Sequence, residues 1–309
     1  MHANANLLHI RAEYDRCTAD LRRSGLLSCL AVSGCFGVTG VDGKEYPMPS
    51  PGFVEELFAQ HTEWLAMKIA QGFSRLEITP LAMPLREMMQ VLEEAILAHG
   101  ADHTIFQTRR SSADPLHPVR VNATKIVWIW ETLRLAIEAD ELIYFPEKSA
   151  GHPRGNTKAD VIYNRRICAV PGWSVGLAEA LPILPGPGEG ATIAGRKQLE
   201  TGLSPREYLQ ILRTPPYQGE TGRTLEEFIT EFLIRLENTG EVSHDVHDSN
   251  ALWFLGQYLK IPYAEVVPTG RWIRDLGRVR LDMHRTGNKK CTKAVGASTI
   301  VRLPSGTFS

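Results

Sequence analysis

The sequence has few cysteines and no long apolar run. Its 309 residues include five cysteines at scattered spacings: Cys17, Cys29, Cys35, Cys168 and Cys291. This pattern argues against a disulfide framework or a structural zinc site, so we expect reduced thiols. No apolar run approaches the roughly 20 residues of a membrane span. Residues 1–13 lack the apolar stretch of a secretory signal, so synthesis in the cytoplasm is expected and the final location stays open.

The composition is that of an ordinary globular protein. Hydrophobic residues make up 43% and charged residues 22% of the chain. We expect an α+β fold and, from the length, about two domains. A Gly-, Pro- and Asn-containing stretch over residues 151–160 is the candidate boundary. It predicts an N-terminal α+β domain of unknown role over residues 1–165 and a second domain over residues 166–309.

Two helix starts are marked by capping boxes. Ser204-Pro205-Arg206-Glu207 and Thr224-Leu225-Glu226-Glu227 each place a hydroxyl at the N-cap and a glutamate three residues later. Apolar residues at helical spacing predict further helices over residues 53–72 and 85–99. Alternating or apolar runs predict strands at residues 30–38, 76–79, 126–130 and 142–146.

Motifs for catalysis or cofactors are weak. Gly190 to Gly195 leads into Arg196-Lys197 and is similar to a phosphate loop, but Lys does not directly follow the second glycine. His244 and His247 could hold a cation on a helix, although they follow a helix stop and favour a solvated loop. We find no esterase or zinc-protease motif. We therefore expect no metal, no cofactor and no enzymatic activity.

Charge is distributed unevenly along the C-terminal part. Residues 200–250 carry ten acids against four arginines, whereas residues 269–303 carry nine basic residues and two acids. The two stretches could dock on each other within one domain. Alternatively, the basic stretch could face a partner.

Residues 267–304 alternate between apolar residues and residues of unrelated character. In a strand, alternate side chains face opposite sides, so Val279 and Leu281 would face the core while Arg278 and Arg280 face out. Trp272 and Val301 would join the core set. Surface substitutions change stability by less than about 0.5 kcal/mol, whereas core truncations cost about 2–5 kcal/mol. The outward positions are thus free to vary, although an ordinary mixed sheet would show the same pattern.

This segment resembles the variable region of proteins diversified by diversity-generating retroelements. The resemblance rests on Val-Pro-x-x-x-Trp-x-Arg-x-x-Gly-x-Val-x-Leu-Asp from Val267, on Gly296 and on the Ile-Val-Arg-Leu-Pro run from Ile300. It extends upstream through residues 195–200 and the capped helices, and more diffusely to residues 42–47. It implies a C-type lectin fold of the formylglycine-generating-enzyme type, with a variable region over about residues 265–303.

The resemblance also implies a ligand-contacting set whose Asn codons are varied by adenine-directed mutagenesis. Carried over, the set is Thr269, Arg271, Ile273, Leu276, Arg278, Arg280, His284, Lys290, Cys291, Thr292 and Lys293. Lys290 and Lys293 cannot arise from an Asn codon, so they are either fixed or derived from other adenine-bearing codons. The implied partner is a variable macromolecular or cell-surface ligand, chiefly a protein, and such proteins occur in viruses and prokaryotes, which allows a place on a virion.

Two other functions remain open. The basic segment could bind nucleic acid, although Trp272 is its only aromatic residue apart from the histidine. The related enzymes on this fold use a close cysteine pair in the C-terminal region, where Cys291 stands alone, so formylglycine generation is the less favoured alternative.

Overall fold

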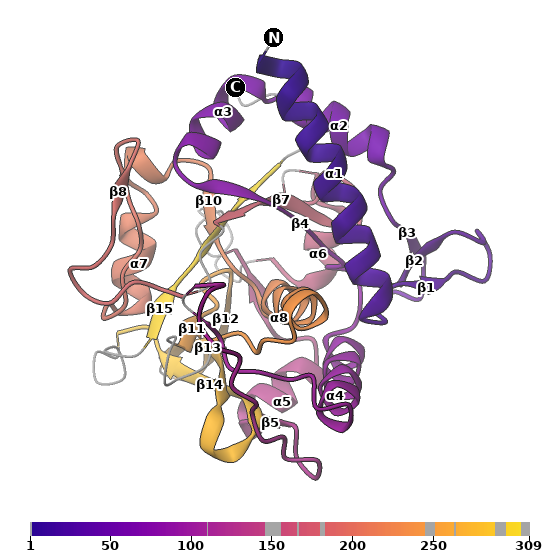
Figure 1. The fold of residues 1–309 in the computed structure, drawn as a ribbon, viewed down its shortest axis with the longest axis vertical. Helices are drawn as coiled ribbons and strands as arrows, with labels where there is room; N and C mark the ends of the chain where they lie inside the picture. The colour runs from indigo at the N-terminus through magenta and orange to yellow at the C-terminus, as the bar shows by residue number, and fades with distance from the viewer. Residues whose placement is uncertain are drawn as a thin grey trace.

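The computed structural model describes residues 2–109, 111–145, 156–165, 167–179, 183–244, 251–262, 264–287 and 295–303. Its α-helices are α1 His2–Arg23, α2 Pro51–Ala59, α3 Thr62–Ala70, α4 Leu85–Ala101, α5 Glu131–Glu138, α6 Lys158–Tyr163, α7 Pro205–Ile211 and α8 Leu225–Thr239. Short 3-10 helices are η2 Pro215–Tyr217 and η3 Arg274–Leu276. With several sheets beside these helices, the fold is α+β, as predicted (Figure 1).

The two larger sheets collect strands from distant parts of the chain. A four-stranded sheet has the order β10 Glu220–Gly222, β16 Thr299–Arg302, β7 Ser174–Glu179 and β4 Phe73–Thr79. The seven-stranded sheet consists of β5 Val127–Ile129, β6 Ile143–Tyr144, β11 Ala251–Trp253, β12 Gln257–Ile261, β13 Ala264–Ile273, β14 Arg278–Arg285 and β15 Val295–Ala297. Here β14 and β5 lie to one side of β13, with β11 and β12 on the other.

Two small sheets complete the strand set. The first joins β1 Ser28–Cys29, β2 Phe36–Thr39 and β3 Glu45–Pro47. The second is the hairpin of β8 Thr192–Ile193 and β9 Arg196–Lys197. The hairpin turn at Ala194 and Gly195 has positive φ at both residues, as two-residue β-hairpins prefer. The apparent phosphate loop is therefore a β-hairpin.

Helix α8 lies at the centre of the molecule, where it packs against α1, α4, β4 and β13 (Figure 1). Its Thr224 capping box forms as predicted, and Gly240 ends the helix in the left-handed conformation. Residues 225–234 are all buried, so the helix is covered on every side. The Ser204 capping box of α7 is also confirmed.

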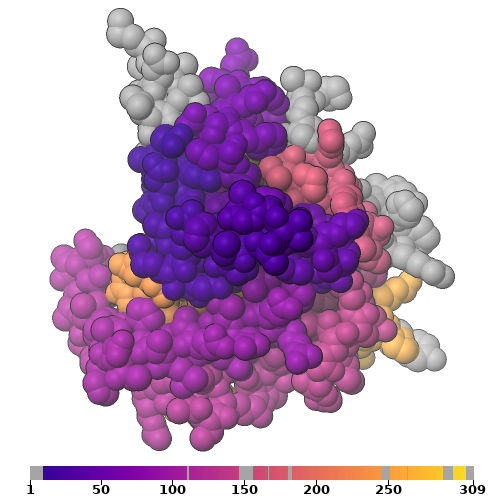
Figure 2. Space-filling model, turned by 90° about the vertical axis from the view of Figure 1, so that its right-hand side faces the viewer, coloured from indigo at the N-terminus to yellow at the C-terminus, as the bar shows by residue number. Residues whose placement is uncertain are grey.

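Segments on both sides of residue 165 build the same sheets and core. Strand β4 pairs with β7, β5 pairs with β14, and β6 pairs with β12. One hydrophobic core runs from Ile10 to Leu303. Seen from the right-hand side of Figure 1, the surface is formed mostly by the first half of the chain (Figure 2). The proposed boundary at residue 165 stays a prediction, and it divides strands that are hydrogen-bonded to each other.

Two helix predictions need correction. The single helix expected over residues 53–72 is two helices, α2 and α3, separated at Gln60 and His61. The helix expected to stop at Gly100 includes this glycine and ends at Ala101. In both cases, apolar spacing predicted the buried face but not the ends. Met88, Met89, Leu92 and Ile96 are buried, as predicted.

Candidate ligand-binding face

The β13–β14 hairpin forms the centre of the candidate site. The two strands pair antiparallel from Val266 opposite Arg285 to Ile273 opposite Arg278. They are joined by η3 and by Gly277, which has a φ of 58°. A Cβ on Gly277 would lie 2.3 Å from the carbonyl oxygen of Arg120, so both the backbone conformation and the close approach favour glycine. The shape of the turn is therefore fixed by backbone packing.

The inner face of the hairpin belongs to the core. Trp272, Val279 and Leu281 are fully buried, as predicted, and Met283 is nearly so. The Trp272 ring packs near Phe232 of α8, with 6.3 Å between the ring centroids. Between these side chains, Gly270 leaves room for two phenylalanine rings, because a Cβ there would lie 2.5 Å from Phe254. This face supplies the stability of the hairpin.

The outer face carries predicted contact residues. Arg271 lies directly opposite Arg280, and Ile273 lies directly opposite Arg278, so all four share one side of the sheet. All four side chains are partly exposed, and Leu276 in the turn is 44% exposed. The predicted inward and outward alternation is confirmed for these residues.

A buried carboxylate orders two of these arginines. Arg280 Nε donates a hydrogen bond to Asp282 Oδ2 at 2.7 Å, and Arg271 Nη2 lies 3.6 Å from the same oxygen. The Asp282 side chain is only 7% exposed, whereas those of Arg271 and Arg280 are 26% and 35% exposed. Asp282 therefore holds two guanidinium groups that remain accessible. Their rotamer freedom is reduced before any ligand arrives.

The expected exposure is wrong for Thr269. It is buried beside Trp253, its partner on β11, because the outer face is covered at this end by a second hydrophobic cluster. That cluster includes Tyr208 and Leu212 from the α7 region. His284 lies at the margin of the cover, with its ring edge-on to Trp253 at 5.6 Å between centroids. Only the uncovered end of the outer face is available to a ligand.

The position of His284 at the edge of this cover shifts its pKa. Burial lowers its pKa below the usual value, and the charges of Arg271 and Arg280 act in the same direction. Asp282 opposes them without cancelling the shift. His284 is therefore biased towards its neutral form. The remaining predicted contact residues, Lys290, Cys291, Thr292 and Lys293, lie outside the described residues.

Sequence reasoning missed the contribution of β5. This strand pairs parallel with β14, placing Trp128 beside Arg280 on the outer face. The guanidinium carbon of Arg280 lies 4.6 Å from the Trp128 ring centroid. The sequence did signal a strand at residues 126–130, but nothing local indicates its partner about 150 residues later.

Charged residues on α8 form an ionic core on the other side of the sheet. The Glu227 carboxylate accepts hydrogen bonds from Arg302 at 2.6 and 2.7 Å and from Ser174 at 3.1 Å. Glu226 accepts from Lys158, Tyr144 and Gln257. Each carboxylate is buried and multiply paired, as buried charges must be. The predicted pairing between the acidic and basic stretches is thus confirmed for Arg302, which binds Glu227. The hairpin arginines Arg271, Arg278 and Arg280 lie on the outer face, away from this ionic core.

The other charged motifs are also internal. Arg196, which follows the apparent phosphate loop, is buried and pairs with Glu220 and Glu179. His244 is buried with Nε2 at 3.3 Å from Glu231 Oε2. Its predicted co-ligand His247 lies outside the described residues. Over the ranges that the structure describes, no group of three His, Cys, Asp or Glu side chains could hold a metal ion.

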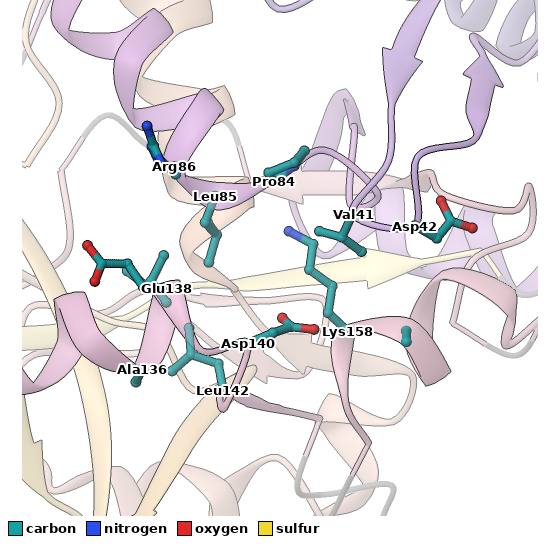
Figure 3. A pocket seen from close by; sticks show the side chains of 12 residues that line it. Val41, Asp42, Pro84, Leu85, Arg86, Ala136, Glu138, Asp140, Leu142 and Lys158 are labelled. Carbon is teal, nitrogen blue, oxygen red and sulfur yellow. The ribbon is translucent and has the colours of Figure 1, made fainter.

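A separate pocket of about 480 Å³ opens between α4, α5 and α6 (Figure 3). Its lining mixes apolar side chains such as Leu85 and Leu142 with charged ones, among them Asp42 and Lys158. These two are already engaged, because Lys158 donates to Met83 O and Glu226, while Asp42 accepts from Tyr46 and Tyr163. None of the predicted contact residues that the structure describes lines it.

Burial acts to raise the pKa of Asp42, but hydrogen bonds from Tyr163, the Lys44 backbone and Tyr46 outweigh it and lower the pKa to about 2. The carboxylate is therefore a fixed, ionised acceptor held by its own neighbours. The pocket has the size of a small-molecule site, but its Asp42 and Lys158 side chains are used internally.

Comparisons with protein-family models, with curated proteins and with solved structures found no match for this chain. Among the described helices, none combines the length and the apolar character needed to cross a bilayer. Inferences about function therefore depend on the outer face of the hairpin and on the motifs in its sequence.

Proposed function

We propose that this chain is a ligand-recognition protein diversified by a retroelement. Its variable side chains would stand on the outer face of β13 and β14 and in the following segment, over about residues 265–303. The protein would act by binding and not by catalysis. Its partner would be a macromolecule, in particular a protein on a cell or virus surface.

The division of the hairpin into two faces carries this proposal. Trp272, Val279 and Leu281 are buried in the core, where Trp272 packs near Phe232 of α8, while Arg271 and Arg278 occupy the opposite side. A diversified protein requires this separation, because randomised side chains must not enter the core. Surface changes of this kind typically cost less than about 0.5 kcal/mol.

We further propose that residues 166–309 form a C-type lectin fold of the formylglycine-generating-enzyme type. In support, the first and last described strands of this segment, β7 and β16, are antiparallel neighbours. Helices α7 and α8 and the β13–β14 hairpin lie between these strands in the chain. This closed arrangement fixes the frame at both ends and leaves the hairpin face free.

The genomic context gives the direct test. DNA near the gene should contain a near-copy of the codons for residues 265–303, next to a reverse-transcriptase gene. Differences between the two copies should fall only where the near-copy has adenine. Sequencing of related isolates should then show substitutions concentrated at Arg271, Ile273, Arg278 and Arg280. Variation spread equally over Trp272, Val279 and Leu281 would contradict the proposal.

A further inference from the structure

Two tryptophans from outside the variable region stand on the same side of the sheet as the hairpin arginines. Strand β5 pairs with β14 in the register Val127 with Val279, Trp128 with Arg280 and Ile129 with Leu281. Paired residues face the same side, so Val127 and Ile129 point towards the core while Trp128 points outward. Trp130 follows Trp128 by two residues and is 44% exposed. Its backbone nitrogen donates to Leu281 O at 2.9 Å, which keeps the register.

The first tryptophan is fixed by contacts with the hairpin. The Arg280 guanidinium lies over the Trp128 ring and also donates to Asp282. Stacking and hydrogen bonding together hold Arg280 in one orientation. Trp130 lies beyond this stack at the start of α5, with its backbone paired to β14. The outer face is therefore continuous from β13 through β14 to β5.

We propose that the recognition surface extends onto β5, where Trp128 and Trp130 are invariant anchors for a protein partner that presents carboxylates beside an apolar side chain. This inference rests on the proposed function of the hairpin face. The variable residues would select the partner, and the two tryptophans would supply affinity common to all of them.

The charge of this face favours an acidic partner. At the uncovered end of this face, Arg271, Arg278 and Arg280 lie beside the Asp282 carboxylate, so the cations outnumber it. Arg278 Nε is buried and has no hydrogen-bond partner in the described part of the chain. A buried donor without an acceptor is costly. Reorientation of the partly exposed Arg278 side chain would let a ligand carboxylate accept from its guanidinium.

The apolar groups on this face favour a protein over a nucleic acid. Ile273 lies directly opposite Arg278, and Leu276 in the turn and Trp130 after β5 are both exposed. Protein interfaces concentrate their binding energy in Trp and Arg beside apolar neighbours. Single-stranded nucleic acids instead need successive free aromatic faces for base stacking. Arg280 already covers Trp128, which leaves Trp130 alone for that purpose.

The experiment uses the full chain and a displayed library of random peptides as the probe. Selected peptides should be enriched in Asp or Glu together with an apolar residue. Titration of a selected peptide should show at least roughly tenfold weaker binding to Trp130→Ala, because buried tryptophans are interface hot spots. Trp128→Ala should also weaken binding, and Trp128→Phe should restore part of it.

Met67→Ala is the matched control, because Met67 is 44% exposed on α3, at the opposite end of the molecule from β5 (Figure 1). It should bind as the unmodified protein does. Thermal unfolding of each variant separates lost binding from lost folding. Hydrogen exchange on the complex should show added protection over residues 126–130.

The outcomes separate this inference from the proposed function. If Ile273→Ser with Arg278→Ser abolishes binding while both tryptophan variants bind normally, the extension onto β5 is wrong and the hairpin proposal survives. If neither the Ile273 and Arg278 double variant nor the tryptophan variants bind more weakly, both proposals are wrong. Selection of peptides without acidic residues, or tighter binding of oligothymidylate with a steep salt dependence, overturns the acidic protein partner.

Discussion

The two faces of the β13–β14 hairpin differ in what a substitution would change. On the inner face, Trp272 and Leu281 are fully buried against the α8 side of the molecule. On the outer face, Arg271 and Arg278 are partly exposed. Core positions and accessible positions thus alternate along one strand. The difference shows that a substitution should be costly on the inner face and cheaper at outer positions that do not pair with a buried group.

The arginines repeat this contrast within one residue type. Arg302 on β16 is buried and held by Glu227, whereas Arg278 on β14 faces out and is partly exposed. Both belong to the same basic stretch of sequence. Charge alone therefore does not tell a structural arginine from one that could bind a ligand.

The largest expected effect comes from Arg302→Met. Removing this guanidinium leaves the Glu227 carboxylate buried without its main partner, which should cost about 3–5 kcal/mol of unfolding free energy. The same substitution at Arg278 should cost less than about 0.5 kcal/mol. Denaturant unfolding of the two variants measures the difference. Equal costs would break the contrast between the two arginines.

A leucine pair tests the two faces with identical chemistry. Leu281→Ala removes a fully buried side chain and should cost about 2–5 kcal/mol, because a cavity remains. Leu276→Ala, at a side chain that is 44% exposed, should change stability by less than about 0.5 kcal/mol. Chemical denaturation followed by circular dichroism compares them. A costly Leu276→Ala would show that the turn belongs to the core.

One pair of substitutions on the outer face should be costly, although most substitutions there should hardly change stability. Arg271→Ser with Arg280→Ser removes both cations from Asp282 and should cost about 1–3 kcal/mol, because the carboxylate is left without its charged partners. Asp282→Asn should recover part of this loss. Ile273→Ser with Arg278→Ser, the neighbouring pair, is the control and should be nearly neutral. If Asp282→Asn gives no recovery, the carboxylate is not the cause.

The smallest effect concerns His284, where the exposed and covered ends of the outer face meet. Its pKa is lowered in the folded protein, so below about pH 6.5 the unfolded chain takes up a proton that the folded chain resists. Stability should therefore fall as the pH drops from about 7.5 to about 5.5. His284→Gln should show a shallower fall in the same denaturation series. If the unfolding free energy of His284→Gln fell with pH as steeply as that of the unmodified protein, burial at the covered end would not lower the pKa of His284.

The sequence predicted elements whose signals are local. The capping boxes at Ser204 and Thr224 formed, because a hydroxyl and a glutamate three residues apart satisfy the same helix end. The alternation around Val279 and Leu281 also held, because strand geometry alone sets the period. The single helix over residues 53–72 was wrong, since apolar spacing continues across the break at Gln60 and His61.

The candidate face was predicted only in part. Arg271, Ile273, Arg278 and Arg280 share one accessible side, as their spacing indicated. Thr269 has the same spacing, yet it is buried, because cover comes from the distant α7 region. The sequence did not predict that Trp128 belongs to this face, because β5 joins β14 only through long-range pairing.

The sequence by itself determined which side chains of the hairpin alternate, because the two-residue period of a strand is a property of the backbone. It also determined the helix starts, where capping groups lie within one turn. Only the tertiary structure decided which end of the outer face is open and which strand extends it. Burial and strand pairing depend on segments far apart in the chain, and no local pattern encodes their meeting.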